Sequence, residues 1–123
     1  MGNRIKWIVY KNKRILFHDY SGIRGFQGEG EQLAQEVNEF VEKLTEYNIL
    51  ELVDVRNSFG DLESVKRLKE ISKRLKPRIK KSAVIGVSGI KKVILDAINT
   101  FSERKIKPFK TEEEAKEWLI LED

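Results

Sequence analysis

The first part of the chain alternates between apolar and polar side chains. From Arg4 to Tyr10 this alternation has the two-residue period of a pleated strand. A polar stretch, residues 11–13, separates it from a second apolar run between Arg14 and His18. Because the connection is this short, the pattern predicts an antiparallel hairpin.

Farther along, the pattern switches repeatedly between helical and extended segments. Apolar residues spaced by three and four positions predict helices, and short apolar runs between them predict buried strands. The expected helices cover residues 31–47, 61–76, 90–101 and the segment after Thr111, and the expected strands cover residues 49–55, 82–87 and 105–109. Pro77 ends the second helix because a proline ring cannot continue one.

Two of these helices carry further local signals. Six apolar residues of the third helix are expected to form one buried stripe: Ile90, Val93, Ile94, Ala97, Ile98 and Phe101. Thr111 is a suitable N-cap for the last helix, and the glutamates that follow it favour the positive end of a helix dipole. Asp61 is the corresponding cap for the second helix.

A hairpin followed by alternating strands and helices requires crossover connections between parallel strands. The pattern therefore predicts an α/β fold, in which a mixed, mostly parallel five-stranded sheet with an N-terminal β-hairpin carries about four helices on its two faces. A chain of 123 residues is long enough for one hydrophobic core, so residues 1–123 are expected to form a single domain.

Composition mainly excludes functions. The chain has no cysteine and one histidine, which excludes disulfides and cysteine-based zinc sites, and no cofactor or metal is expected. No stretch approaches the roughly 18 apolar residues of a membrane span. The first ten residues also lack the pattern of a secretory signal, so a reducing, cytoplasmic location is expected.

Charge is unevenly distributed, although the net charge is only +4. Residues 29–51 and 112–123 are acidic, whereas residues 66–81 form a basic run. The basic run includes Lys66, Arg67, Lys69, Lys73 and Arg74. Such a run is either the solvated face of a helix or a contact surface for phosphates, an anionic membrane or an acidic protein. It contains no aromatic residue and no nucleic-acid-binding motif, which makes nucleic acid the least favoured partner.

Candidate binding residues follow two of the predicted strands. Ligands of open α/β sheets bind beyond the carboxyl ends of the strands. The expected crevice residues are Tyr20, Asp54, Asn57, Ser58, Ser88 and Gly89. Free amides at the start of the helix after Gly89, with Lys91 and Lys92 beside them, are suited to an anion. A structural interpretation stays open, in which these residues only form turns and helix caps.

The spacing of three residues also suggests a rival function. Asp54, Ser88 and Lys107 follow successive strands, as in response-regulator receiver domains, which would make the protein a phosphoacceptor or a small enzyme. Phosphoryl transfer to aspartate needs Mg²⁺ and more than one carboxylate ligand. The first strand ends in basic residues, and Asp19 is a single substitute. His18 beside it is either half of a catalytic pair or a half-buried residue at a strand end.

Several segments together resemble a known family. The hairpin and the runs "LFHDYSG", "LVDVRNSFGD", "AVIGVSGIKK" and "KPFKTEEEAKEWL" are similar to SpoIIAA-like small domains of the STAS/SEC14 type. The resemblance implies a STAS-like fold and a non-enzymatic role in binding or regulation. Some such domains are anti-sigma-factor antagonists switched by serine phosphorylation, and others are suspected of binding nucleotides or lipids.

One part of the family pattern is missing. Sigma-antagonist members carry an Asp-Ser-Ser-Gly run at a helix start, but here Asp61 is followed by Leu62 and Glu63. Ser58 and Asp61 are the remaining candidates for a regulatory position. We therefore expect a binding or regulatory module for a protein partner or a small anionic or lipid-like ligand. No pattern specifies an oligomeric state.

Overall fold

A five-stranded mixed sheet forms the centre of the computed structural model, which describes residues 4–58 and 65–121. Its strands are β1 (Ile5–Tyr10), β2 (Lys13–Asp19), β3 (Ile49–Asp54), β4 (Ile79–Ile85) and β5 (Lys107–Phe109), and they lie side by side in this order. β1 and β2 form the antiparallel hairpin, and each later neighbour pairs in parallel. The predicted sheet is confirmed.

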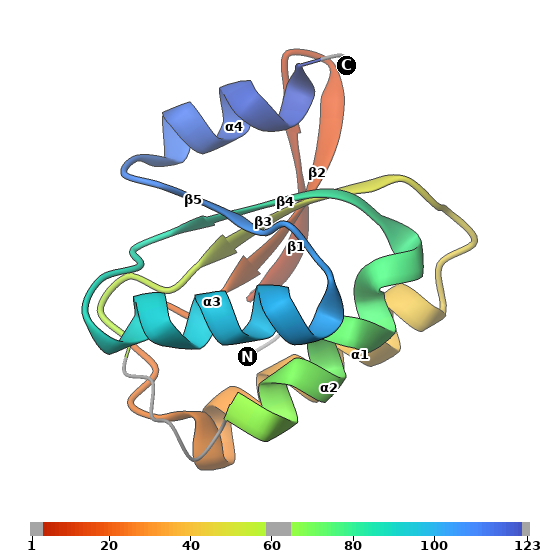
Figure 1. Ribbon diagram of the computed structural model, residues 1–123. Coiled ribbons are helices and arrows are strands. Elements are labelled where there is room, and N and C mark those ends of the chain that lie inside the picture. Colours follow the sequence, from red (N-terminus) through yellow and green to blue (C-terminus); the bar gives the residue numbers. More distant parts are fainter. Residues whose placement is uncertain (1–3, 59–64, 122–123) are drawn as a thin grey trace.

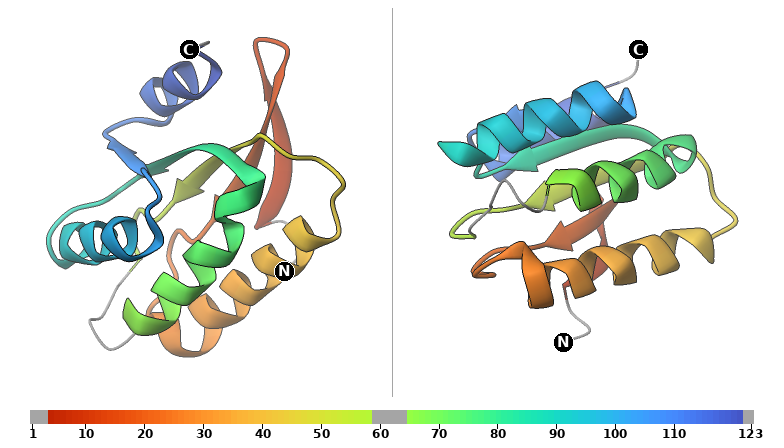
Figure 2. Two further views of the ribbon diagram at one scale, coloured as in Figure 1. Left: turned by 45° about the vertical axis from the view of Figure 1, so that its right-hand side comes forward. Right: turned by 60° about the horizontal axis from the view of Figure 1, so that its bottom comes forward.

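Helices cover both faces of this sheet (Figure 1). The α-helices are α1 (Glu31–Glu42), α2 (Val65–Leu75), α3 (Ile90–Ser102) and α4 (Glu112–Ile120), with short helical turns η1 (Phe26–Gly30) and η3 (Lys76–Arg78). Figure 2 shows that α1, α2 and α3 lie on one face and α4 lies on the other. No helix in the described ranges is long and apolar enough to cross a bilayer.

Alternate strand residues divide the core between the two faces, because successive side chains of a strand point in opposite directions. The face toward α4 holds Ile15, Leu52, Ala83 and Ile85, which pack against Ala115 and Leu119 of that helix. The face toward α1 holds Leu16 and Ile49, which pack against Leu33, Val37 and Val41. The sheet therefore separates two apolar clusters.

Several predicted boundaries are wrong, including the start of β5, which lies at Lys107 rather than at residue 105. α1 ends at Glu42 rather than at residue 47, because the Arg78 guanidinium donates to the carbonyls of Leu44 and Glu46 and holds the chain outside the helix. β4 begins and ends earlier than the predicted residues 82–87. It stops before Gly86, whose φ of +94° suits glycine and whose added Cβ would lie 2.6 Å from the Arg56 amide nitrogen.

The orientation of α3 also differs from the predicted buried stripe. Ile94 and Ser102 are buried, but Ile90, Val93 and Phe101 are 46%, 55% and 44% exposed. The helix carries apolar residues around more than one face, so spacing alone did not identify the inward side. The cap of α4 is confirmed, because Thr111 Oγ1 accepts a hydrogen bond from the Glu114 amide at 3.1 Å. The predicted cap at Asp61 lies outside the described residues.

Candidate functional site

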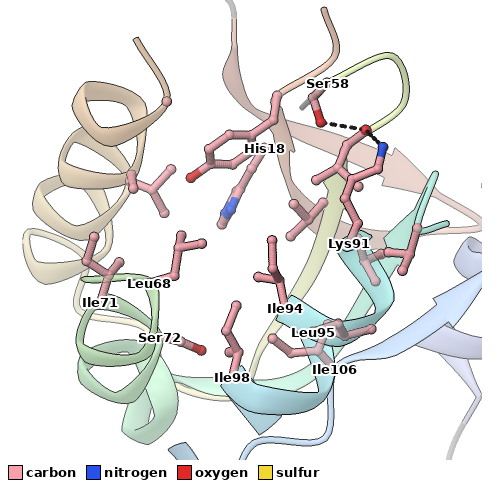
Figure 3. A pocket seen from close by; sticks show the side chains of 18 of the residues that line it. His18, Ser58, Leu68, Ile71, Ser72, Lys91, Ile94, Leu95, Ile98 and Ile106 are labelled. Atoms are coloured by element: carbon pink, nitrogen blue, oxygen red, sulfur yellow. Dashed lines mark hydrogen bonds between the residues drawn. The ribbon is translucent and has the colours of Figure 1, made fainter. Parts of the chain in front are cut away.

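A cavity of about 200 Å³ lies between the sheet and the helices α1, α2 and α3. Figure 3 shows Leu68 and Ile71 of α2 facing Ile94 and Ile98 of α3 across it. Most of the residues around it are aliphatic, and the β-strands contribute side chains of modest size such as Val84. The helices therefore do not close fully onto this face of the sheet.

A buried polar cluster borders the same cavity. Glu51 of β3 is 2% exposed and pairs with Arg104, which follows α3. The Arg104 guanidinium also donates to Ser82 Oγ and, at 3.0 Å, to Ser72 Oγ. Ser82 Oγ in turn donates to Glu51 Oε1 at 2.5 Å, and His18 Nδ1 lies 3.4 Å from Glu51 Oε2. One carboxylate thus gathers groups from β2, β4 and the segment after α3.

The protonation states in this cluster follow from their surroundings. Burial by itself raises the pKa of Glu51, but the Arg104 charge, then His18 and the hydrogen bonds, outweigh burial and keep the pKa below its usual range. Burial lowers the pKa of His18, and the opposing effect of Glu51 does not restore it. Glu51 is therefore ionised and His18 is neutral near pH 7.

At the carboxyl end of β3, two side chains meet at one carbonyl group. Lys91 Nζ donates to the Val55 oxygen at 2.8 Å, and Ser58 Oγ donates to the same oxygen at 2.6 Å (Figure 3). Burial lowers the pKa of Lys91, with partial compensation from Asp54. Tyr20 lies along the cavity too, where burial, and next the Glu51 charge, raise the pKa of its phenol well above the usual range.

The six predicted crevice residues do not all reach this cavity. Tyr20 and Ser58 line it. Asp54 is 3% exposed, and its carboxylate accepts hydrogen bonds from the Arg56 guanidinium at 3.0 and 2.8 Å and from the Arg56 amide at 2.9 Å. The other three, Asn57, Ser88 and Gly89, are exposed at the ends of β3 and β4.

His18 differs from both predictions made for it. It is 2% exposed rather than half-buried, and its charged neighbour is Glu51, across the β2–β3 pair, rather than Asp19. Asp19 instead accepts hydrogen bonds from Ser21. Sequence reasoning also missed Arg104 and Ser72. The one available signal was Glu51 itself, because a carboxylate within a buried apolar strand requires a partner.

The residues with receiver-like spacing have other contacts. Asp54 is engaged by Arg56, and Ser88 is exposed. Lys107 Nζ lies 5.6 and 5.5 Å from the ring centres of Phe109 and Trp118 on the α4 side. Within residues 4–58 and 65–121, three or more His, Asp or Glu side chains nowhere gather closely enough to hold a metal ion.

The predicted basic run lies mainly on α2, and part of it contacts α3. Lys69 and Lys73 place their ammonium groups 5.5 and 5.3 Å from the centre of the Phe101 ring. Lys66 and Arg74 are exposed, and Arg67 forms a 3.2 Å ion pair with Glu31 of α1. The run therefore forms a cationic surface beside the exposed apolar residues of α3.

Comparisons with known proteins agree on the fold. The crystal structure of an uncharacterized protein from the DUF3478 family, with a SpoIIAA-like fold, from Shewanella loihica PV-4 superposes with a TM-score of 0.70. The alignment covers 94% of this chain and 91% of that chain at 18% identity. No curated protein matches the sequence. The SpoIIAA-like sequence profile matches residues 25–120, which is most of the chain. This protein therefore belongs to the SpoIIAA-like family.

Proposed function

We propose that this protein is a non-enzymatic binding module that encloses a small, largely apolar ligand between the sheet and α1, α2 and α3. The observation that carries the proposal is the cavity of about 200 Å³ with its mainly aliphatic lining. An apolar protein cavity of about 150 Å³ binds a molecule such as benzene. The space here suits a single substituted ring or a short chain.

The state of the charged groups supports binding rather than catalysis. Arg104 holds the Glu51 carboxylate, and Arg56 holds the Asp54 carboxylate. A general base needs a carboxylate or imidazole within reach of a substrate proton and a pKa near the working pH. Both carboxylates are instead committed to guanidinium partners, and burial lowers the pKa of the His18 imidazole away from the working pH. The SpoIIAA-like fold likewise suggests a binding or regulatory module.

Two residues of the predicted crevice form part of the proposed binding site. Tyr20 and Ser58 belong to the cavity, and Asp54, Asn57, Ser88 and Gly89 stay predicted contacts for a ligand or partner outside it. Ser58 is the hydroxyl that reaches the cavity from the segment after β3, so it is also the position we propose for regulation. A modification there would replace its hydrogen bond to the Val55 carbonyl.

Filling the cavity tests the proposal. Isotope-labelled protein is titrated with p-xylene, and amide shifts are expected in the strands and helices around the cavity, including Val53, Val84 and Ile94. Ala34→Leu adds a large side chain to the lining and should abolish these shifts. Ala97→Leu, on α3 but outside the lining, is the folded control. Shifts confined to α4, or binding unaffected by Ala34→Leu, would contradict the proposal.

A second candidate function rests on the surface shared by α2 and α3. Ile90, Val93 and Phe101 are exposed within an arc of roughly 80° on α3, given 3.6 residues per turn. Lys69 and Lys73 of α2 lie over Phe101. Exposed apolar side chains bordered by cations match the interfacial zone of an anionic bilayer. We propose peripheral membrane contact through this surface.

Vesicle binding distinguishes this contact from a solvated helix face. Sedimentation with phosphatidylserine-containing vesicles should exceed that with phosphatidylcholine alone and should fall with added salt. Val93→Asp should reduce binding several-fold, whereas Glu113→Gln, on α4, should not. If neither kind of vesicle binds the protein but an acidic protein binds through the same residues, the surface is a protein interface and the membrane assignment is wrong.

A further inference from the structure

The imidazole of His18 lines the cavity. The side chain is almost wholly buried, and it projects into the space between α1 and α3 in Figure 3. Nδ1 lies 3.4 Å from the Glu51 carboxylate. Nε2 meets no hydrogen-bonding group among the residues that the structure describes. A buried nitrogen of this kind is rare and calls for a partner.

The position of the proton follows from the neighbour of Nδ1. An ionised carboxylate only accepts hydrogen bonds, so the proton of a neutral imidazole lies on Nδ1, toward Glu51. Nε2 then carries a bare lone pair. Because burial lowers the pKa of His18, a second proton does not fill this position near pH 7. The unpartnered nitrogen of this cavity-lining side chain is therefore a hydrogen-bond acceptor.

We propose that the ligand of the cavity is a neutral, single-ring or short-chain molecule with a hydroxyl group that donates to His18 Nε2. Phenols and small alcohols fit this description, and pure hydrocarbons lack the donor. This inference rests on the proposed function and specifies the ligand class for the same cavity. The aliphatic lining contacts the body of the ligand, and His18 fixes its polar end.

The charges behind His18 argue against an anionic group at this end. A ligand carboxylate would face the Nε2 lone pair, with the Glu51 carboxylate beyond the ring. Arg104, the buried cation nearby, already donates to Glu51, Ser72 and Ser82. Lys91, another cation of the lining, already donates to the Val55 carbonyl. A neutral hydroxyl satisfies Nε2 without adding a second negative charge.

Two nearly isosteric probes isolate the hydroxyl. p-Cresol and p-xylene differ by one hydroxyl in place of one methyl group, and the ratio of their dissociation constants is measured for the wild type and for His18→Phe. A buried hydroxyl that loses its partner weakens binding substantially, so we expect the preference for p-cresol to fall about tenfold in the variant. An unchanged ratio would overturn the inference.

A measurement on the wild type covers the case in which His18→Phe does not fold. His18 is the single histidine of the chain, so its imidazole nitrogen resonances identify themselves. They should show an unprotonated Nε2 that shifts with p-cresol and stays in place with p-xylene. A protonated Nε2, or equal responses to both probes, would overturn the inference and leave the cavity proposal standing. If neither probe binds, the cavity proposal itself fails.

Discussion

The two faces of the sheet are built differently, although the same strands form both. On the α4 face, Ile15, Leu52, Ala83, Ile85, Ala115 and Leu119 are at most 1% exposed and pack into one apolar cluster. On the opposite face, a cavity of about 200 Å³ adjoins the buried Glu51–Arg104 pair. The α4 face is therefore a filled apolar core, whereas the opposite face leaves a cavity beside a buried ion pair.

The difference arises residue by residue along single strands. In β3, Leu52 faces α4, whereas Glu51 and Val53 face the cavity side. In β4, Ala83 belongs to the filled cluster, whereas Val84 lines the cavity. Because neighbouring strand residues point to opposite faces, one face can supply stability while the other is free to bind.

The largest expected effect is the loss of the buried cation. Arg104→Met leaves Glu51 without its guanidinium partner, and removing one partner of a buried ion pair costs about 3–5 kcal/mol. The free energy of unfolding should fall by that amount in a urea titration. Adding Glu51→Gln to Arg104→Met should recover part of the loss, because it removes the uncompensated charge.

The matched control is an exposed ion pair. Lys76 Nζ lies 3.3 Å from Glu103 Oε1, and these side chains are 46% and 80% exposed. Lys76→Met should change the unfolding free energy by about 0–1 kcal/mol, as is usual for surface pairs. A comparable loss in both variants would mean that the buried cluster has no special role in stability.

The next largest effect is expected from truncating an apolar side chain, and its size should differ between the two faces of the sheet. Leu119→Ala removes a fully buried side chain from the filled cluster and should cost about 3 kcal/mol. Ile98→Ala removes a half-buried side chain that already borders the cavity, and should cost roughly 1 kcal/mol, since fewer contacts are lost. Thermal and urea unfolding measure both. Equal losses would show that the cavity side packs as tightly as the α4 side.

Sequence patterns predicted the architecture well for physical reasons. Period-two alternation, the short hairpin connection and the alternation of strands with helices sufficed for the mixed sheet. These patterns failed where contacts with residues distant in the chain decide where a helix ends or which of its sides is buried. α1 ends early because Arg78 captures carbonyls that lie more than thirty residues before it. α3 presents Val93 to solvent because its apolar residues do not define one face.

The candidate site was harder to predict than the fold. Tyr20 and Ser58, which line the cavity, could be proposed from the sequence because ligands of open α/β sheets bind beyond the ends of strands. Arg104 and Glu51 are 53 residues apart in the chain, and no local spacing relates them. His18 likewise depends on a parallel pairing of β2 with β3, which brings it beside Glu51 only in the folded sheet. Glu51 in an apolar strand signalled a buried charge but not its partner.

Acidification should lower the free energy of unfolding through two buried groups on the cavity face, His18 and Glu51. The pKa of His18 is lowered in the folded state, so the unfolded chain binds the proton first. Stability is therefore full above the ordinary histidine value of about 6.5 and declines below it, by up to about 1.4 kcal/mol per pH unit. Glu51, whose folded pKa is also lowered, adds a further loss when the pH falls below its ordinary value of 4.5.

Urea unfolding at pH 7.5, 6.5 and 5.5 measures this decline. His18→Phe removes the one histidine and should flatten the profile between pH 6.5 and 5.5. Thr111→Ala, which changes the α4 face, should leave the slope unaltered. A wild-type profile that is flat in this interval would show that the folded protein accommodates a protonated His18.

The smallest expected difference concerns how the helices on the two faces begin. Thr111 Oγ1 caps α4, and Thr111→Ala should lower the unfolding free energy by about 1 kcal/mol. Gly89, whose φ is +57°, directly precedes α3. The first turn of α3 is closed by backbone hydrogen bonds from the Lys91 amide to the Ser88 carbonyl and from the Lys92 amide to the Gly89 carbonyl. Ser88 is exposed, so Ser88→Ala should cost less than about 0.5 kcal/mol.

Amide hydrogen exchange reports on the first turn of each helix separately, which the free energy of unfolding of Thr111→Ala and Ser88→Ala does not. Thr111→Ala should increase amide exchange in the first turn of α4, including Glu114, whose amide loses its acceptor. Ser88→Ala should leave exchange in α3 unchanged, because backbone carbonyls close that turn. If Ser88→Ala instead accelerated exchange throughout α3, a side-chain cap would hold the cavity-side helix, and both faces would begin their helices in the same way.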